Sequence, residues 1–368
     1  MQSRTLCHSH LLFWGAEMTD RAASLGLIDF DRPVVAIDIA KDVFQIHAYD
    51  HGSKKTERVQ VTRSALLRNV AKRPPSVIAM EACGGAHHWA RSFEKMGHQI
   101  RLLPAAHVSP FCVGDKTDSN DAQAIYVAAQ QRHIKSVPVK TINQQALLAI
   151  HRMRALLMKT RISQSNSLRG ILSEFGIVVP KGFPNLMKRI DAALEKAVAI
   201  GVPQMAIASL QELVARIQAT QQDLDKMTER IERESRESEV SRTLMEIPGI
   251  GPIGATALST TDLHRFKSGR AFAAWLGLTP RQSGTGGKVI QLGLNKRGDQ
   301  YLRMLIMQGA RAVVSSSPRN QTDWVKGLLS RRPAGVVAGA MAGRIARTVW
   351  AILVRGDKFD HKAWGLAY

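Results

Sequence analysis

The sequence is poor in cysteine and in long apolar runs. Its three cysteines, Cys7, Cys83 and Cys112, are widely spaced and form no CxxC pair, so we expect neither a disulfide framework nor a cysteine zinc site. The apolar run at residues 11–15 is too short for a signal-peptide core, and no segment reaches about 18 uninterrupted apolar residues. These absences favour a soluble, cytoplasmic protein that does not span a membrane.

Acidic residues are also scarce relative to basic ones. The chain has 51 Lys and Arg against 30 Asp and Glu, which gives a formal net charge of +21. A positive surface field concentrates polyanions and makes affinity for phosphate backbones dependent on salt. Nucleic acid is therefore the first partner to expect, although charge alone does not separate an enzyme from a binding protein.

The length of 368 residues predicts two or three domains. Residues 1–32 read as an irregular extension in which Met18 is a candidate start. An α/β domain is predicted at 33–140, a helical connector at 141–240 and a mainly α-helical domain at 241–368.

Strands alternate with helices in the first domain. Residues 33–50 predict a strand entering a hairpin, residues 76–80 a buried strand that closes at Glu81, and residues 100–103 a short strand. Helices are predicted at 88–96 and 121–131, with Asp118 or Ser119 as the N-cap of the second. This alternation indicates an α/β fold.

The connector is long, polar and helical, with a Pro and Gly interruption at 180–184. Apolar residues recur there every seven positions, with further apolar residues at the intermediate positions: Leu210, Ile217, Leu224 and Ile231, then Leu213 and Met227. This spacing suits a coiled coil of about three heptads. A single amphipathic helix packed on its own domain fits it equally well.

Four carboxylates in the first domain suggest a metal site. Asp38 lies in an apolar strand, Glu81 closes another, and Asp118 and Asp121 are one helical turn apart. Each alone would be read as a surface or capping residue, but four gathered carboxylates repel one another unless a cation balances them. All-oxygen ligation fits Mg²⁺ or Mn²⁺, and two such ions serve phosphodiester chemistry. This order of acids is typical of RNase H-like and RuvC-like nucleases.

The C-terminal region contains a second candidate site. Residues 247–254 resemble a helix-hairpin-helix, in which Gly249 and Gly251 allow a tight turn whose N–H groups hold a DNA phosphate; an ordinary Pro-Gly turn is the alternative. A loop rich in Gly and basic residues follows at 279–303. His87 and His88 lack a partner at ligand spacing, so no zinc site is expected.

Together these segments resemble one known family, the DEDD transposases of bacterial insertion sequences, which are related to the pilin-gene inverting recombinase. The resemblance covers nearly everything from residue 33 to 355. It rests on five segments in the family's order: AIDIAKDVF around Asp38, IAMEACGGAHHWAR around Glu81, KTDSNDAQAIYVA around Asp118 and Asp121, IPGIGPIGA, and LGLTPRQSGTGGK with NKRGDQYLR.

The resemblance implies a RuvC-like domain, a coiled-coil connector and a helical transposase domain that supplies a serine nucleophile. It also implies a structured guide RNA that pairs with donor and target double-stranded DNA. The protein would act on the nucleoid as a dimer or tetramer, with the acidic site of one subunit completed by the serine of another.

Ser283 is the only serine in the turn where the family carries its nucleophile, and Thr285 is the next candidate. Asn295 stands where many relatives have Ser or Thr. The serine would need stabilisation of its alkoxide, and four basic residues are candidates to hold the scissile phosphate: Arg281, Lys288, Lys296 and Arg297. A flexible Gly-rich turn is the structural alternative. A hydrolytic RuvC-like junction nuclease and a non-enzymatic nucleic-acid-binding protein are the alternative functions.

Overall fold

The computed structural model describes residues 32–50, 54–115, 117–316 and 321–365. The chain divides into two compact units, unit 1 at residues 1–141 and unit 2 at residues 142–368, and each is described by itself. The expected N-terminal extension, with Cys7 and Met18, lies outside the described residues except for Arg32. Unit 2 contains both the connector and the C-terminal region, whose division into two domains stays a prediction.

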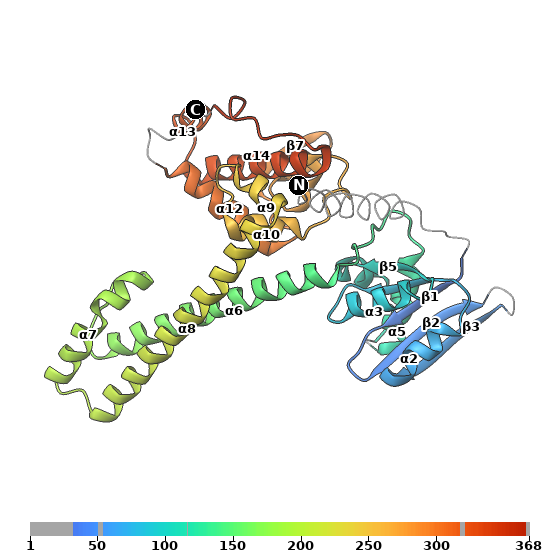
Figure 1. Cartoon of the computed structure of the whole chain (residues 1–368), viewed down its shortest axis with the longest axis horizontal. Coiled ribbons are helices and arrows are strands. Elements are labelled where there is room, and N and C mark those ends of the chain that lie inside the picture. Colours follow the sequence, from blue (N-terminus) through green and yellow to red (C-terminus); the bar gives the residue numbers. More distant parts are fainter. Residues whose placement is uncertain (1–31, 51–53, 116, 317–320, 366–368) are drawn as a thin grey trace, which may run out of the picture. The chain divides into compact units, whose positions relative to one another are not determined.

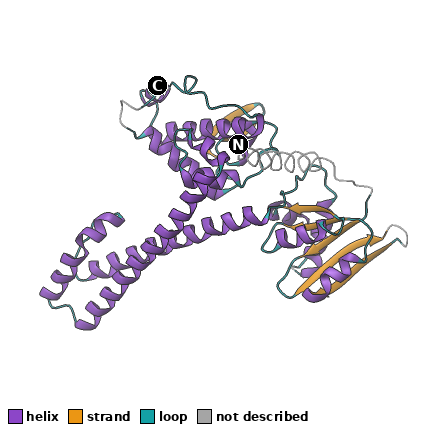
Figure 2. Ribbon diagram, in the orientation of Figure 1, coloured by secondary structure: helices purple, strands orange, loops and turns teal. Residues whose placement is uncertain are grey.

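Unit 1 is built on a five-stranded mixed sheet in the order β3-β2-β1-β4-β5 (Figure 2). The strands β1, β2 and β3 form an antiparallel meander, and β4 and β5 extend the sheet in parallel with β1. This arrangement confirms the expected α/β, RNase H-like class. The elements are β1 (Val34–Asp38), β2 (Val43–Asp50), β3 (Lys55–Thr62), α2 (Arg63–Ala71), β4 (Val77–Glu81), α3 (Ala86–Glu94), β5 (Gln99–Leu103), α4 (Ala105–Val108), a 3-10 turn η1 (Ser109–Phe111) and α5 (Asp118–Ala129).

Both faces of the central strands are covered, which explains why β1 and β4 read as nearly continuous apolar runs. Val35 and Ile37 of β1 pack in a core with α2 and α3. Ala36 of β1 and Ala79 of β4 point to the opposite face, where they pack against α5. Both alanines are fully buried, and their small side chains let α5 lie close to the sheet.

Unit 2 begins with two long helices, α6 (Ile142–Glu174) and α8 (Gln204–Glu237), which pack side by side with α7 (Phe183–Ala199) near their far end (Figure 1). They run antiparallel, because Arg154 donates to Thr228 Oγ1 (2.9 Å) while Thr220 donates to Gln164 (3.1 Å). All the predicted heptad residues of α8 are buried, apart from a partly buried Leu213. The heptad seam therefore packs on helices of the same chain.

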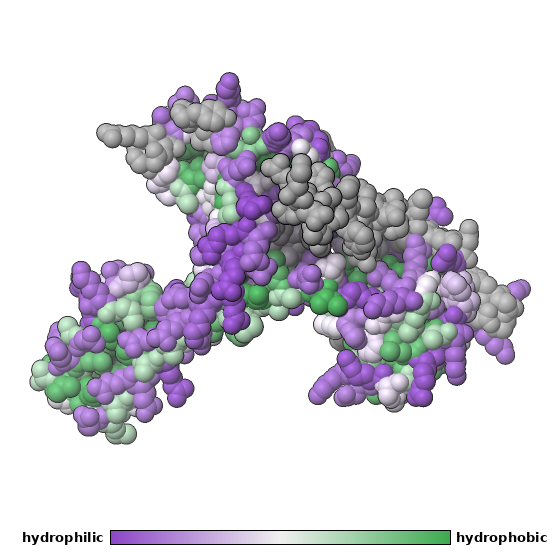
Figure 3. All heavy atoms as spheres, in the orientation of Figure 1, coloured by the Kyte–Doolittle hydropathy of each residue, from purple (hydrophilic) through white to green (hydrophobic). Residues whose placement is uncertain are grey.

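The exposed surface of α6, α7 and α8 also separates into a hydrophilic part and a hydrophobic part. Along α8 the outward residues are hydrophilic, and hydrophobic surface gathers at the α7 end (Figure 3). Long helices gain most of their stability from packing an apolar face rather than from intrinsic propensity. The apolar seam is therefore what holds this helical arm together.

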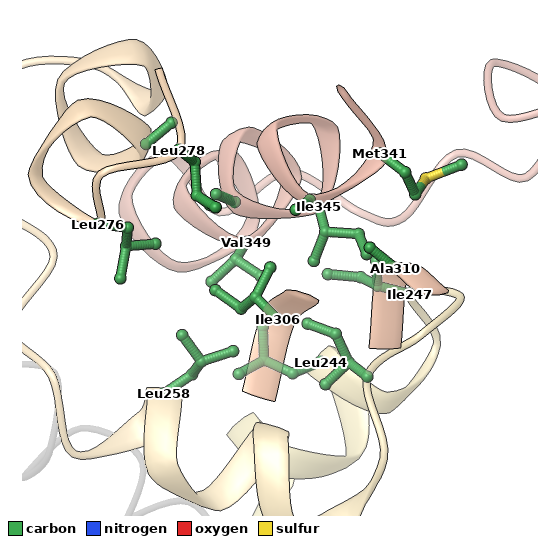
Figure 4. Close-up of a cluster of buried hydrophobic side chains, with 14 of the residues drawn as sticks. Leu244, Ile247, Leu258, Leu276, Leu278, Ile306, Ala310, Met341, Ile345 and Val349 are labelled. Carbon is green, nitrogen blue, oxygen red and sulfur yellow. The ribbon is translucent and has the colours of Figure 1, made fainter. Parts of the chain in front are cut away.

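The remainder of unit 2 is a helical bundle with one β-hairpin. Its elements are α9 (Glu239–Met245), α10 (Pro252–Ser259), α11 (Gly269–Trp275), β6 (Pro280–Thr285), β7 (Lys288–Leu294), α12 (Gln300–Val314), α13 (Asp323–Leu329) and α14 (Ala334–Arg355). Leu244, Ile247, Ile306 and Ile345 meet in its core (Figure 4). The helix α14 is long and apolar enough to cross a membrane by composition alone, but its apolar residues form the centre of this core.

Two parts of the chain differ from the predictions. The segment after the β1–β2 hairpin forms β3 and α2, which were not predicted. The Gly-rich segment expected to be a loop forms the hairpin β6–β7, which turns at Gly286 and Gly287, both with positive φ. Two central residues with positive φ give a turn whose twist matches that of paired strands.

Candidate functional site

The alternation of side chains along β1 and β4 places two of the acids. Asp38 lies two residues beyond Ala36, and Glu81 lies two residues beyond Ala79, so both acids project toward the face covered by α5. Because β1 and β4 are parallel with Ile37 beside Met80, their carboxyl ends lie side by side. Asp38 and Glu81 are therefore neighbours at one edge of the sheet.

The first turn of α5 supplies the other two acids. Thr117 is the N-cap, and its side chain accepts a hydrogen bond from the Asn120 N–H (3.3 Å), so the prediction of Asp118 or Ser119 as the cap was wrong. Asp118 instead begins the helix. Asp121 lies one turn before Ile125, which is buried against the sheet, so the same helical stripe that packs in the core carries Asp121 to Asp38.

Three of the four acids converge. The carboxylate oxygens offered by Asp38, Asp118 and Asp121 all lie within 4.8 Å of one another. Burial and then the charges of Asp121, Asp118 and Glu81 raise the pKa of Asp38 from 3.8 to about 6, while a hydrogen bond from the backbone of Ile39 opposes this rise. Glu81 acts on Asp38 electrostatically but lies outside the three-residue cluster.

The donor set fits a hard divalent cation. It offers only carboxylate oxygens, the ligands that Mg²⁺, Mn²⁺ and Ca²⁺ prefer. Burial and the neighbouring acids both disfavour the ionised form of Asp38, as its raised pKa indicates, and a bound cation would offset that cost. Asp38, Asp118 and Asp121 are the residues that would hold a metal ion here, with Glu81 beside them.

Two cysteines border the cluster. Cys112 donates a hydrogen bond through Sγ to Asp121 (3.4 Å). Burial, followed by the charges of Glu81 and Asp38, raises the pKa of Cys83. The place of these two cysteines beside the acids was not predicted. For Cys112, the surrounding residues carry no sequence signal that would bring its side chain to α5. The Thr117 cap, by contrast, follows from the preference for Thr at this position.

Ser283 lies in unit 2, on the strand β6. It pairs with Ile290 of β7, and Thr285 pairs with Lys288 at the turn. Paired residues on antiparallel strands share a face, so Ser283, Thr285 and Lys288 lie on the same side of the hairpin. Every residue of β6 is exposed, which leaves the Ser283 hydroxyl accessible.

Four basic residues predicted to hold phosphate, Arg281, Lys288, Lys296 and Arg297, are all exposed on or just after this hairpin. Lys296 has a φ of 59°, a conformation uncommon for a residue with a side chain. Its backbone N–H donates to Gly277 (3.1 Å), and Arg303 donates to Arg297 O (2.9 Å). The end of the hairpin is thus tied to the bundle by its backbone.

The two glycines of the predicted helix-hairpin-helix have different environments. Gly249 has a φ of 89°, and a Cβ there would lie 2.8 Å from the carbonyl oxygen of Gly309, so close packing on α12 explains this glycine. Gly251 is exposed and precedes α10, and a Cβ added at this position would have no other atom within 4 Å. Phosphate binding at this turn stays a prediction.

Sequence comparisons place the chain among known proteins. A model described as the transposase IS116/IS110/IS902 family matches residues 241–324, and a DEDD transposase model matches residues 35–177. A probable family 20 transposase of Pseudomonas aeruginosa is 40% identical over 87% of this chain and 96% of its own length. The transposase of insertion sequence element IS1328 of Yersinia enterocolitica is 35% identical over 89% and 98%. That of IS1111A of Coxiella burnetii is 33% identical over 89% and 92%.

Proposed function

The chain belongs to the IS116/IS110/IS902 family of transposases, and we propose that it cleaves and rejoins DNA through a covalent intermediate on Ser283, directed by a structured guide RNA. It is a DNA transposase with an α/β, RuvC-like DEDD domain, and its acidic cluster indicates the use of a divalent metal. The observation that carries the metal-dependent chemistry is the convergence of Asp38, Asp118 and Asp121 on one side of the sheet, while the roles of Ser283 and the guide RNA rest on the family resemblance.

We propose Mg²⁺ or Mn²⁺ as the metal, held by Asp38, Asp118 and Asp121 with Glu81 as a fourth ligand. When bound, such an ion offsets the negative charge that builds on the phosphate oxygens during displacement. Through such an ion, the carboxylates on α5 and the sheet would position the scissile phosphate.

In the proposed reaction Ser283 Oγ attacks the phosphorus of a DNA phosphodiester. The new P–Oγ bond forms as the bond to the leaving strand oxygen breaks, and the serine proton ends on that oxygen as a hydroxyl. A hydroxyl of another strand then attacks the phosphoserine, forms the new phosphodiester and returns the proton to Ser283. Arg281 and Lys288, exposed near Ser283 on the hairpin, would orient the phosphate.

The finer partners rest on the family resemblance. We propose that the guide RNA pairs with donor and target double-stranded DNA, and that Gly249 and Gly251 of the hairpin turn, with Lys296 and Arg297, grip the phosphate backbone. The net charge of +21 supports binding of both nucleic acids. We further propose a homodimer or tetramer in which the serine of one subunit serves the acids of another.

The test is a recombination assay with purified protein, Mg²⁺, donor and target duplexes, and RNA transcribed from the DNA flanking the gene. We expect a protein–DNA adduct that survives denaturation, requires the RNA, and disappears in Ser283→Ala but not in the matched variant Thr285→Ala. Loss of the adduct in Thr285→Ala alone would move the nucleophile to Thr285. Free hydrolysis products without an adduct would favour a hydrolytic junction nuclease.

A further inference from the structure

A row of polar residues continues the acidic cluster across the sheet. Asp38 of β1 pairs with Gln45 of β2, and Gln45 pairs with Gln60 of β3. Paired residues on antiparallel strands project to the same face, so both glutamines lie on the α5 side of the sheet with Asp38. The row leads from the acids to β3, the edge strand of the sheet.

Helix α5 covers the next row and leaves this one open. The ring of His47 packs on Tyr126 of α5 at 5.0 Å, and Arg58 donates to Gln123 of α5 (3.0 Å). Both His47 and Arg58 lie two residues from the glutamines, one row further along the same face. Because α5 begins near Asp38 and runs over this neighbouring row, it does not bury the glutamine row.

The two glutamine side chains are available to a ligand. Gln45 is half-buried and Gln60 is exposed. Within the described ranges, neither side chain has a hydrogen-bond partner. Each therefore presents a free amide, with two N–H donors and one acceptor oxygen.

We propose that Gln45 and Gln60 form a subsite for the sugar-phosphate backbone of the DNA strand whose scissile phosphate lies at the acidic cluster. Glutamine N–H groups commonly donate to phosphate oxygens without reading sequence. A lysine or arginine beside Asp38 would compete with a divalent cation for the carboxylate, whereas a neutral amide binds phosphate without that competition.

The dimensions of the row suit neighbouring nucleotides of one strand. Adjacent strands of a sheet lie about 4.8 Å apart, so Gln60 lies about 10 Å from Asp38 across the sheet. One strand of duplex DNA advances by about 3.4 Å per nucleotide along the helix axis. The row therefore reaches the backbone within a few nucleotides of the scissile phosphate.

This inference rests on the proposed function, because it assigns a strand to the acidic cluster. The test compares the affinity of the full chain for a fluorescent DNA duplex of mixed sequence in Ca²⁺ and in EDTA, at fixed salt. The gain in affinity on adding Ca²⁺, a hard cation that carboxylates bind, isolates binding at the acidic cluster from binding elsewhere on this basic protein. Asp38→Asn should remove that gain.

We expect Gln45→Ala and Gln60→Ala each to reduce the Ca²⁺-dependent gain by about 3- to 10-fold, the range of one ordinary hydrogen bond that stays partly exposed to water. The matched control is Gln130→Ala. Gln130 is an exposed glutamine that follows the last residue of α5, at the end opposite the acids, and this variant should bind as the wild type does.

Each other outcome is decisive. If the wild type shows the gain and Asp38→Asn removes it while both glutamine variants keep it, the subsite is wrong and the proposed function stands. If the wild type shows no gain, the metal-dependent function fails and the subsite fails with it. If calorimetry without DNA shows that Gln45→Ala weakens Mn²⁺ binding itself, Gln45 orients the carboxylates and does not bind the strand.

Discussion

Replacing Asp38 by Asn should stabilise the metal-free protein while abolishing its metal site. In the folded chain the pKa of Asp38 is raised from 3.8 to about 6 by burial and by the neighbouring acids, so ionising this group opposes folding. Asparagine keeps the size of the side chain and an oxygen that can accept the Ile39 N–H, but it carries no charge. The variant thus removes both the cost of burying an ionised group and its repulsion by the neighbouring acids.

The magnitude follows from the shift. About two pKa units correspond to nearly 3 kcal/mol, and because Asp38 is only partly buried we reduce this for solvent screening to about 1–2 kcal/mol. The sign follows from the direction. At pH 4, close to the unfolded-state pKa of 3.8, only a small part of this gain should be present. The gain should grow as pH rises from about 4 to 6, where Asp38 is ionised in the unfolded state and still largely protonated in the folded one, and it should be complete near pH 8.

The assay compares the free energy of unfolding of the wild type and Asp38→Asn in urea, in EDTA at pH 4 and pH 8. Unfolding is monitored by hydrogen exchange of peptides from β1 and α5. These peptides report on unit 1 alone. Adding Mg²⁺ at pH 8 should reverse the order, because only the wild type retains the full set of ligands. A variant no more stable than the wild type at pH 8 in EDTA would refute the view that ionising Asp38 opposes folding.

Two further predictions concern unit 2. Gly309→Ala should lower the free energy of unfolding by about 3 kcal/mol, because its Cβ would collide with the carbonyl oxygen of Gly249. Urea denaturation should show a loss of no more than about 1 kcal/mol for the control Gly251→Ala, whose Cβ has room but replaces Gly at the N-cap of α10. Equal losses in the two variants would contradict the close packing of Gly309. Burial lowers the pKa of His151 to about 4, so its contribution to stability is present above pH 6.5 and lost as pH falls toward 4. In His151→Gln the free energy of unfolding should therefore fall less between pH 6.5 and 4 than in the wild type. An unchanged pH dependence of this free energy would contradict the lowered pKa of His151.

The central elements of the fold were predictable because buried strands require apolar residues, and these stand out in the sequence. β1 and β4 are covered on both faces, so their apolar runs stand out. The strand β3 was not recognisable in the same way, because it lies at the edge of the sheet. Its exposed positions carry Thr56, Arg58 and Gln60, and only Val59 and Val61 pack against the core. The hairpin β6–β7 is exposed on both faces and has no period of burial, although its Gly-Gly pair was a usable turn signal.

The acidic site was predictable in composition but less so in geometry. Asp38 and Glu81 follow strands whose ends the sequence marks, and Asp118 and Asp121 share a helical turn by their spacing. The order of the strands, which makes Asp38 and Glu81 neighbours, depends on pairing between distant segments that no local pattern encodes. The position of Gln45 beside Asp38 also follows only from the register of β1 and β2.

The two alanines beneath α5 have a consequence for how copies of such a gene decay. Ala36 and Ala79 carry no chemistry, yet they set how near Asp121 can come to Asp38, because any larger side chain in that fully buried layer would lift the helix. A copy of the gene could therefore encode all four acids and Ser283 and still produce an inactive transposase. Inspecting the acidic residues alone would not detect inactivation by a larger residue at position 36 or 79.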